Sequence, residues 1–159
     1  MRRRAVVALA SALVAWLVVA NNVDLHANAP VADWARPRVV RTSTGITAFY
    51  PRAWRAQVGN GTLVISSSAD ARLPRGGVYI WLANYGRMPR TNGFAARPRH
   101  FDLWDADRGF QSCGFGFEGW NLTFVDHGQT VQAIVGLGSG ARNSDATAVL
   151  DKLVIRPAA

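Results

Sequence analysis

Two apolar runs on either side of Asp126-His127-Gly128-Gln129 constrain the fold more than any other feature of this sequence. In the first run, large apolar residues alternate with polar ones and therefore share one face of a strand; they are Trp120, Leu122 and Phe124. Gly128 supplies the positive φ that a tight reversal requires. The pattern predicts a β-hairpin, and the change of alternation at Gly119 predicts a β-bulge there.

A helix and a last strand are expected after the hairpin. The stretch Arg142–Lys152 is predicted to be a helix, with Ser144 as a candidate N-cap, and four apolar residues in it and directly after it lie at spacings that place them on one face. These four residues are Ala146, Val149, Leu150 and Leu153. The run Leu153–Ile155 then predicts a short strand, so the C-terminal part of the chain should cover a sheet with an amphipathic helix.

The region before the hairpin is rich in short β-type runs punctuated by Gly, Pro and Asn. Strands are predicted at Val39–Thr42, Ile46–Tyr50, Thr62–Ser67, Val78–Asn84 and Phe101–Trp104, and a short helix is predicted at Pro51–Trp54. Trp81, between Ile80 and Leu82, is expected to pack inside. The predicted fold class is α+β, a single antiparallel sheet of about five to seven strands covered by the C-terminal helix and the short helix.

The first twenty residues are typical of a targeting segment. Three arginines, Arg2 to Arg4, precede a 16-residue apolar run that ends in Val18-x-Ala20. This pattern predicts a signal peptide or an N-terminal membrane anchor at residues 1–20, a linker at 21–38 and a single domain at 39–157. The domain should then be extracytoplasmic, either secreted or tethered to the cytoplasmic membrane.

Charge is distributed unevenly along the 159 residues, whose formal net charge is +8. Between Arg36 and Arg99 there are eleven arginines and one acid, Asp70. A basic surface of this kind suits an anionic partner. Two alternatives remain open: the two halves of the chain neutralise each other, or the arginines reflect a GC-rich genome.

The basic loop Tyr85–His100 is the candidate binding site, because long loops often carry function. Its candidate binding residues are Arg87, Arg90, Arg97 and Arg99. The expected partner is an anionic envelope polymer, lipid headgroups or another envelope protein. Nucleic acid is not expected, since the domain should lie outside the cell.

Cys113 is the single cysteine and a possible reactive thiol. His127 or His100 could serve as its base, with Asp102 or Asp126 as the orienting carboxylate. A structural thiol and an intermolecular disulfide are the alternatives. The residues predict no catalytic group, no metal site and no cofactor, so the protein is expected to be a non-enzymatic binding module. Two alternatives are a small-molecule-binding protein with a pocket between sheet and helix, and a Cys113-dependent enzyme.

Several motifs together resemble a known group of proteins. They are Phe49-Tyr50-Pro51-x-x-Trp54, Arg97-Pro98-Arg99-x-Phe101, Cys113-Gly114, Val125-Asp126-His127-Gly128 and Ala148-x-Leu150-Asp151-Lys152-Leu153-Val154. Over residues 39–156 the chain is similar to small exported actinobacterial proteins of unknown function with a PsbP/Mog1-like fold. The resemblance implies an α/β/α sandwich, but none of the metal-linked chemistry of photosynthetic PsbP proteins, because no ligand residue matches.

Overall fold

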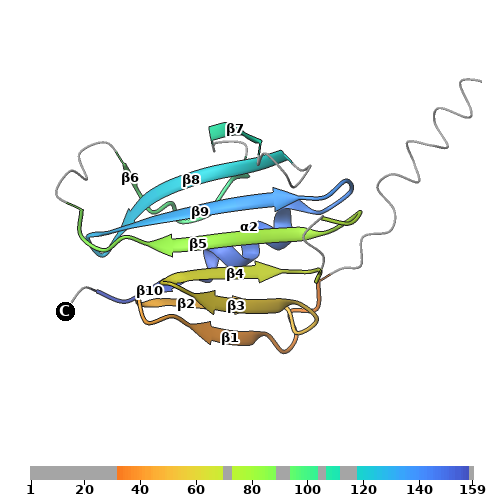
Figure 1. The fold of residues 1–159 in the computed structure, drawn as a ribbon, viewed down its shortest axis with the longest axis horizontal. Helices are drawn as coiled ribbons and strands as arrows, with labels where there is room; N and C mark the ends of the chain where they lie inside the picture. The colour runs from red at the N-terminus through yellow and green to blue at the C-terminus, as the bar shows by residue number, and fades with distance from the viewer. Residues whose placement is uncertain (1–31, 70–72, 89–93, 104–106, 112–117, 158–159) are drawn as a thin grey trace, which may run out of the picture.

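The computed structural model describes residues 32–69, 73–88, 94–103, 107–111 and 118–157 (Figure 1). The predicted leader at residues 1–20 lies outside the described residues, as do Trp104, Arg90 and Cys113. The described residues form ten strands and one helix. They are β1 (Arg38–Arg41), β2 (Ile46–Tyr50), β3 (Arg55–Gly59), β4 (Thr62–Ser66), β5 (Val78–Asn84), β6 (Ala95–Ala96), β7 (Asp107–Gln111), β8 (Glu118–Asp126), β9 (Gln129–Leu137), α2 (Asn143–Asp151) and β10 (Val154–Ile155).

The strands form two sheets, so the α+β class is confirmed but the single antiparallel sheet is not. The larger sheet has seven strands in the order β3-β4-β5-β9-β8-β6, with β7 also paired to β8, and β6 runs parallel to β8. The smaller sheet has the order β1-β2-β10. The chain leaves this sheet directly after β2, at Pro51, which has no backbone N–H to donate to a ladder.

The short helix predicted at Pro51–Trp54 is a turn, closed by a 3.0 Å hydrogen bond from Trp54 N to Pro51 O. The strand β3 follows at once and pairs with β4 across Asn60 and Gly61. Both turn residues have positive φ, 48° and 78°, which is the geometry of a two-residue hairpin. An Asn-Gly hairpin needs a strand on each side, and β3 is the one that the sequence analysis missed.

The hairpin of β8 and β9 is confirmed. His127 and Gly128 have φ values of 48° and 74°, and Asp126 pairs with Gln129. The predicted face also holds, since Phe124 is buried and Trp120 packs against the core. The predicted bulge is on the other strand: β7 shifts register between Arg108 and Phe110, which pair with Trp120 and Gly119. The extra residue therefore belongs to β7.

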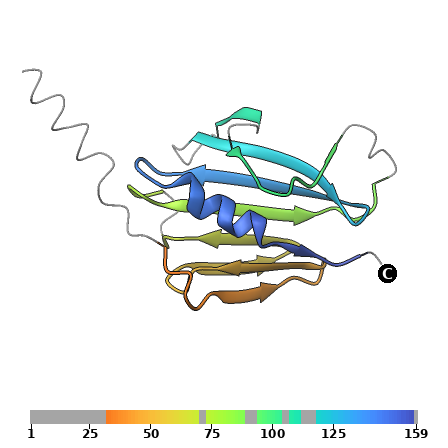
Figure 2. The same ribbon diagram turned by 180° about the vertical axis from the view of Figure 1, so that it is seen from behind.

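Helix α2 covers one face of the larger sheet, and the opposite face carries no helix among the described residues (Figures 1 and 2). Its buried residues are Ala146, Val149 and Leu150, as the apolar spacing predicts. Arg142, rather than Ser144, is at the N-cap, with no side-chain capping bond. Each fully buried aliphatic side chain contributes roughly 1.5–3 kcal/mol, so this face is a main source of the helix's stability.

One hydrophobic core joins the two sheets and the helix. It includes Ile46 of β2, Leu63 of β4, Ile80 of β5 and Leu150 of α2. Trp81 lies on the opposite face from Ile80 and is only half-buried, so the inward placement predicted for it is wrong. An apolar run identifies a strand but not which of its faces points inward.

A buried polar cluster connects the sheets at the β8–β9 turn. The Asn84 amide donates to Thr44 O at 2.7 Å and to Gln129 Oε1 at 2.6 Å. The Gln129 amide in turn donates to Arg156 O, next to β10. These bonds satisfy polar groups that would otherwise be costly to bury and hold the ends of β5, β9 and β10 together.

Residues of the predicted linker contact the folded unit. Ala32 and Trp34 pack against the core. The Lys152 ammonium lies 3.8 Å from the centre of the Trp34 ring, a cation–π contact. The packed unit therefore extends N-terminally to Ala32 at least.

Candidate functional site

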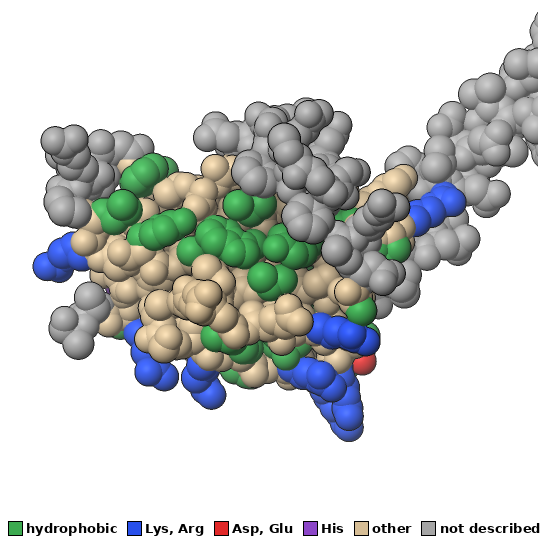
Figure 3. Space-filling view, viewed as in Figure 1, with side chains coloured by type: hydrophobic (Ala, Val, Ile, Leu, Met, Phe, Trp, Pro, Cys, Tyr) green, Lys and Arg blue, Asp and Glu red, His purple; other side chains and the backbone are tan. Residues whose placement is uncertain are grey.

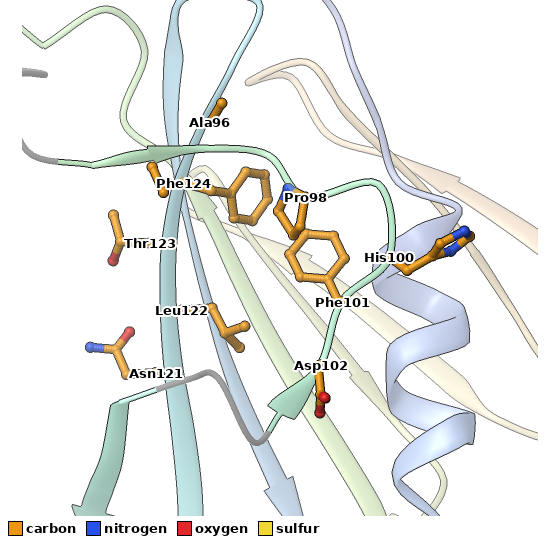
Figure 4. Close-up of a pocket in the computed structure, with 10 residues that line it drawn as sticks. Ala96, Pro98, His100, Phe101, Asp102, Asn121, Leu122, Thr123 and Phe124 are labelled. Carbon is orange, nitrogen blue, oxygen red and sulfur yellow. The ribbon is translucent and has the colours of Figure 1, made fainter.

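Segment 94–103 carries part of the predicted basic loop and crosses from β6 towards the C-terminal end of α2 (Figure 4). Arg97 lies at the centre of this junction, with 20% of its side chain exposed. Its Nη1 is 2.9 Å from Asp126 Oδ2, and its Nη2 donates to Leu150 O at 3.1 Å and Asp151 O at 3.0 Å. The last carbonyls of a helix lack internal partners and favour a nearby cation. Arg97 therefore serves as a structural link between β8, α2 and this segment.

The Asp151 carboxylate holds the backbone of the same segment. Phe101 N donates to Asp151 Oδ1 at 2.8 Å, and His100 Nδ1 lies 3.4 Å from Asp151 Oδ2. The Arg97 guanidinium carbon is 5.9 Å from the centre of the Phe101 ring. We call Arg97, His100, Asp126 and Asp151 the helix junction. Within it, the Arg97 guanidinium contacts Asp126 and the carbonyls at the end of α2.

The structure describes three of the four arginines predicted as a binding surface. Arg97 is used by the helix junction, whereas Arg87 and Arg99 are exposed and Arg90 lies outside the described residues. Arg87 lies beside the β8–β9 turn, since a Cβ at Gly128 would be 3.8 Å from its guanidinium. The loop thus offers two described exposed cations.

The thiol chemistry proposed for Cys113 has no described geometry, because Cys113 is outside the described residues. Two of its candidate partners, His127 and Asp126, lie beside each other. His127 Nε2 lies 3.6 Å from Asp126 Oδ1, and Asp126 also pairs with Arg97. His100 is at the helix junction with 77% of its side chain exposed.

A cleft lies between segment 94–103 and β8 (Figure 4). Its volume is about 280 Å³. Phe101 and Phe124 form an edge-to-face pair in its wall, with ring centres 5.1 Å apart, and Leu122 and Pro98 add apolar surface. Asn121, Thr123, His100 and Asp102 contribute polar groups. The two phenylalanines are also core residues, so the cleft is a shallow groove over the core.

A second basic surface, not singled out by the sequence analysis, includes β1, the turn after β2 and the start of β3. We call its arginines the basic edge: Arg36, Arg38, Arg41, Arg52 and Arg55. Arg38 and Arg41 end β1, and Arg38 pairs with Tyr50, two residues before Arg52. In Figure 3, arginine and lysine side chains gather along the lower edge of the molecule, where β1 lies.

The arginines of the basic edge are exposed, and within the described ranges none forms an ion pair with a carboxylate. The reason is visible in the sequence, which has no acidic residue between Asp33 and Asp70. Asp33 Oδ1 accepts a 2.9 Å hydrogen bond from Ala35 N. The signal that could have identified this surface is thus an acid-free stretch containing exposed arginines.

A guanidinium presents several fixed N–H donors, which match the oxygens of carboxylates and phosphates in bidentate geometry. Several such groups along one edge can contact an extended anion at several points. In the portion of the chain that the structure describes, no cluster of three His, Cys, Asp or Glu side chains could hold a metal ion. The exposed guanidinium groups of the basic edge suit an anionic partner.

No protein-family model matches this chain, and no curated protein is significantly similar to it in sequence. The described residues include no helix that is long and apolar enough to cross a bilayer.

Proposed function

We propose that this protein is an exported, non-enzymatic binding module that holds an anionic partner at the cell envelope through the basic edge. One observation carries the proposal: five exposed arginines lie in or next to β1, in the turn after β2 and at the start of β3, and none has a carboxylate partner among the described residues. The leader-like sequence of residues 1–20 supports export.

The basic edge is favoured over the two other candidate surfaces. The basic loop has Arg97 committed to internal contacts. The cleft has a volume of about 280 Å³, below the roughly 300–1,000 Å³ usual for small-molecule sites. We therefore place the binding surface at β1 rather than at residues 87–99.

A PsbP/Mog1-like origin of the fold is part of the proposal. The order of a final helix and strand, α2 and β10, supports it, as does a sheet covered by a helix on one face. An α/β/α sandwich also needs a helical layer on the second face. An experimental structure of the whole chain, compared with that fold, tests this point.

The binding proposal is tested with the full chain in neutral detergent and with soluble polyphosphate as the probe. Two variants remove the same charge: Arg38→Gln with Arg52→Gln from the basic edge, and Arg87→Gln with Arg99→Gln from the loop. Fluorescence anisotropy at 50–300 mM salt measures Kd for each. We expect the edge variant to bind polyphosphate about tenfold more weakly. The slope of log Kd against log salt concentration should also be lower by about one to two, because this slope reports the number of contacts between arginines and the anion.

The loop variant is the matched control, and its Kd should stay within about twofold of the unmodified protein at each salt concentration. Equal losses in both variants mean that net charge alone drives binding, which contradicts a defined surface. A larger loss in the loop variant places the site at residues 87–99 instead.

A further inference from the structure

We propose that the anionic partner is an extended acidic polypeptide segment, which adds to β1 as a further strand. The inference rests on the proposed function, because it uses the arginines of the basic edge to attract the segment. It adds a second requirement, since the partner must also form main-chain hydrogen bonds with β1. That requirement separates a polypeptide from a polymer or lipid of the same charge.

The outer side of β1 is open among the described residues. β1 is the end strand of the three-stranded sheet and pairs only with β2 in the described parts of the chain. Figures 1 and 2 show no described segment beside it on its outer side. An unpaired strand edge is a template for pairing with another extended chain.

The phase of the β1–β2 ladder shows which backbone groups are available. Thr42 N donates to Ile46 O at 2.9 Å, at the turn that joins the two strands. Residues of an antiparallel strand direct their N–H and C=O alternately to one neighbour and to the other. If we count back from Thr42, the backbone N–H and C=O groups of Val40 and Arg38 also point toward β2. The N–H and C=O groups of Val39 and Arg41 therefore point outward.

The side chains along this edge suit a partner with acidic and apolar residues. Val39 is 43% exposed and lies opposite Phe49 of β2. It shares a face with Arg41, whereas Arg38 lies on the other face with Val40. An added strand therefore contacts the apolar side chain of Val39, and an arginine lies at each end of β1.

A second copy of this chain is a poor occupant. Pairing β1 with β1 brings two basic edges together, and like charges on adjacent strands destabilise a sheet. The chain's own residues 1–31 are also unsuitable, because they contain one acid, Asp24, and three arginines. Charge complementarity favours an acidic segment of another protein.

The test uses three seven-residue peptides and polyphosphate on the full chain. The first peptide alternates Glu with Thr and Val. The second has the same side chains with N-methyl groups on alternate amides, so that it keeps the charge but loses donors on one edge. The third has Gln in place of Glu. We expect the first peptide to bind, and the other two to bind at least tenfold more weakly.

A protein variant tests the same edge from the other side. Val39→Pro removes the outward N–H and leaves all five arginines and the β1–β2 bonds in place, since proline is tolerated on an outer edge. We expect it to bind the acidic peptide at least tenfold more weakly and polyphosphate within twofold of the unmodified protein. Amide exchange gives a direct readout: the peptide should slow exchange at Val39 and Arg41, but not at Val40.

The outcomes separate the two proposals. Equal binding of the plain and N-methylated peptides, or an unchanged peptide affinity in Val39→Pro, overturns strand addition and leaves the basic edge as a charge-only surface. Loss of polyphosphate binding together with peptide binding in Val39→Pro means that the fold is disturbed, and the N-methylated peptide on the unmodified protein then decides. If neither acidic peptide nor polyphosphate binds the unmodified protein, both proposals fail.

Discussion

The helix junction and the basic edge use the same kind of side chain in opposite ways. At the helix junction, Arg97 contacts a carboxylate and two carbonyl oxygens and is mostly buried. At the basic edge, the arginines are exposed and lack a carboxylate partner among the described residues. The difference is that the acids of the second half of the chain fold back on Arg97 but not on β1. A count of arginines therefore says little about binding until the carboxylates are located.

The largest effect is expected from removing the cation of the helix junction. Arg97→Met removes the cation that pairs with the Asp126 carboxylate and donates to the Leu150 and Asp151 carbonyls, so the free energy of unfolding should fall by about 2–4 kcal/mol. Urea denaturation followed by circular dichroism measures it. Arg99→Met, two residues away and exposed, is the control and should change it by less than about 0.5 kcal/mol. Similar losses of stability in both variants would contradict the distinction between the mostly buried, paired Arg97 and an exposed arginine.

The pairing of Arg97 with Asp126 is tested by a double-mutant cycle. Because a half-buried charge without its partner is costly, Arg97→Met combined with Asp126→Leu should be less destabilised than the sum of the single variants, by about 1–2 kcal/mol. Denaturant unfolding of the four proteins gives the coupling energy. Additive losses mean that Arg97 acts only through the carbonyl oxygens of α2.

A smaller effect on stability is expected at the basic edge. Arg38→Gln with Arg52→Gln removes two exposed charges that have no carboxylate partner in the described structure, so the free energy of unfolding should change by no more than about 0.5 kcal/mol. Any gain from reduced repulsion should shrink between 50 and 300 mM salt. Thermal unfolding at 50 and 300 mM salt measures this change in stability. A loss as large as that of Arg97→Met indicates a structural role for this surface.

The smallest effect concerns Asp145, in the first turn of α2. Burial raises the pKa of its carboxyl above the ordinary value of 3.8, although nearby Arg142 opposes the shift. The folded state then binds this proton more tightly, so its stabilising contribution is present below pH 3.8 and is lost as the pH rises through the raised pKa. The stability of Asp145→Asn relative to the unmodified protein should therefore increase over that interval and then stay level. Urea titrations at closely spaced pH values measure the difference, and a decrease over the same interval contradicts the raised pKa.

The sequence predicted the elements whose signals are local. The β8–β9 hairpin follows from Gly128 and the alternation before it, and the buried face of α2 follows from the spacing of Ala146, Val149 and Leu150. The strand β3 was missed although Asn60-Gly61 required it, because Pro51-x-x-Trp54 was interpreted as a helix start. These signals act within a few residues, where backbone geometry decides the structure.

The candidate site was less predictable. Arg97 and Asp126 are 29 residues apart in sequence, and Arg97 lies 54 residues from the Asp151 carbonyl that it also contacts. No spacing rule connects such residues. The basic loop was therefore interpreted as one surface, although the structure uses Arg97 internally. The absence of acids between Asp33 and Asp70 was a better indicator of exposed positive charge.

By itself, the sequence determined β1, β2, β4, β5, the β8–β9 hairpin and the apolar face of α2, because alternation and turn residues act through the local backbone. Only the tertiary structure decided that the strands divide into two sheets, that Trp81 faces away from the core, and which arginines lack carboxylate partners in the described structure. Burial and pairing between distant segments settle these points, because many partners are compatible with the same local pattern and packing selects one of them.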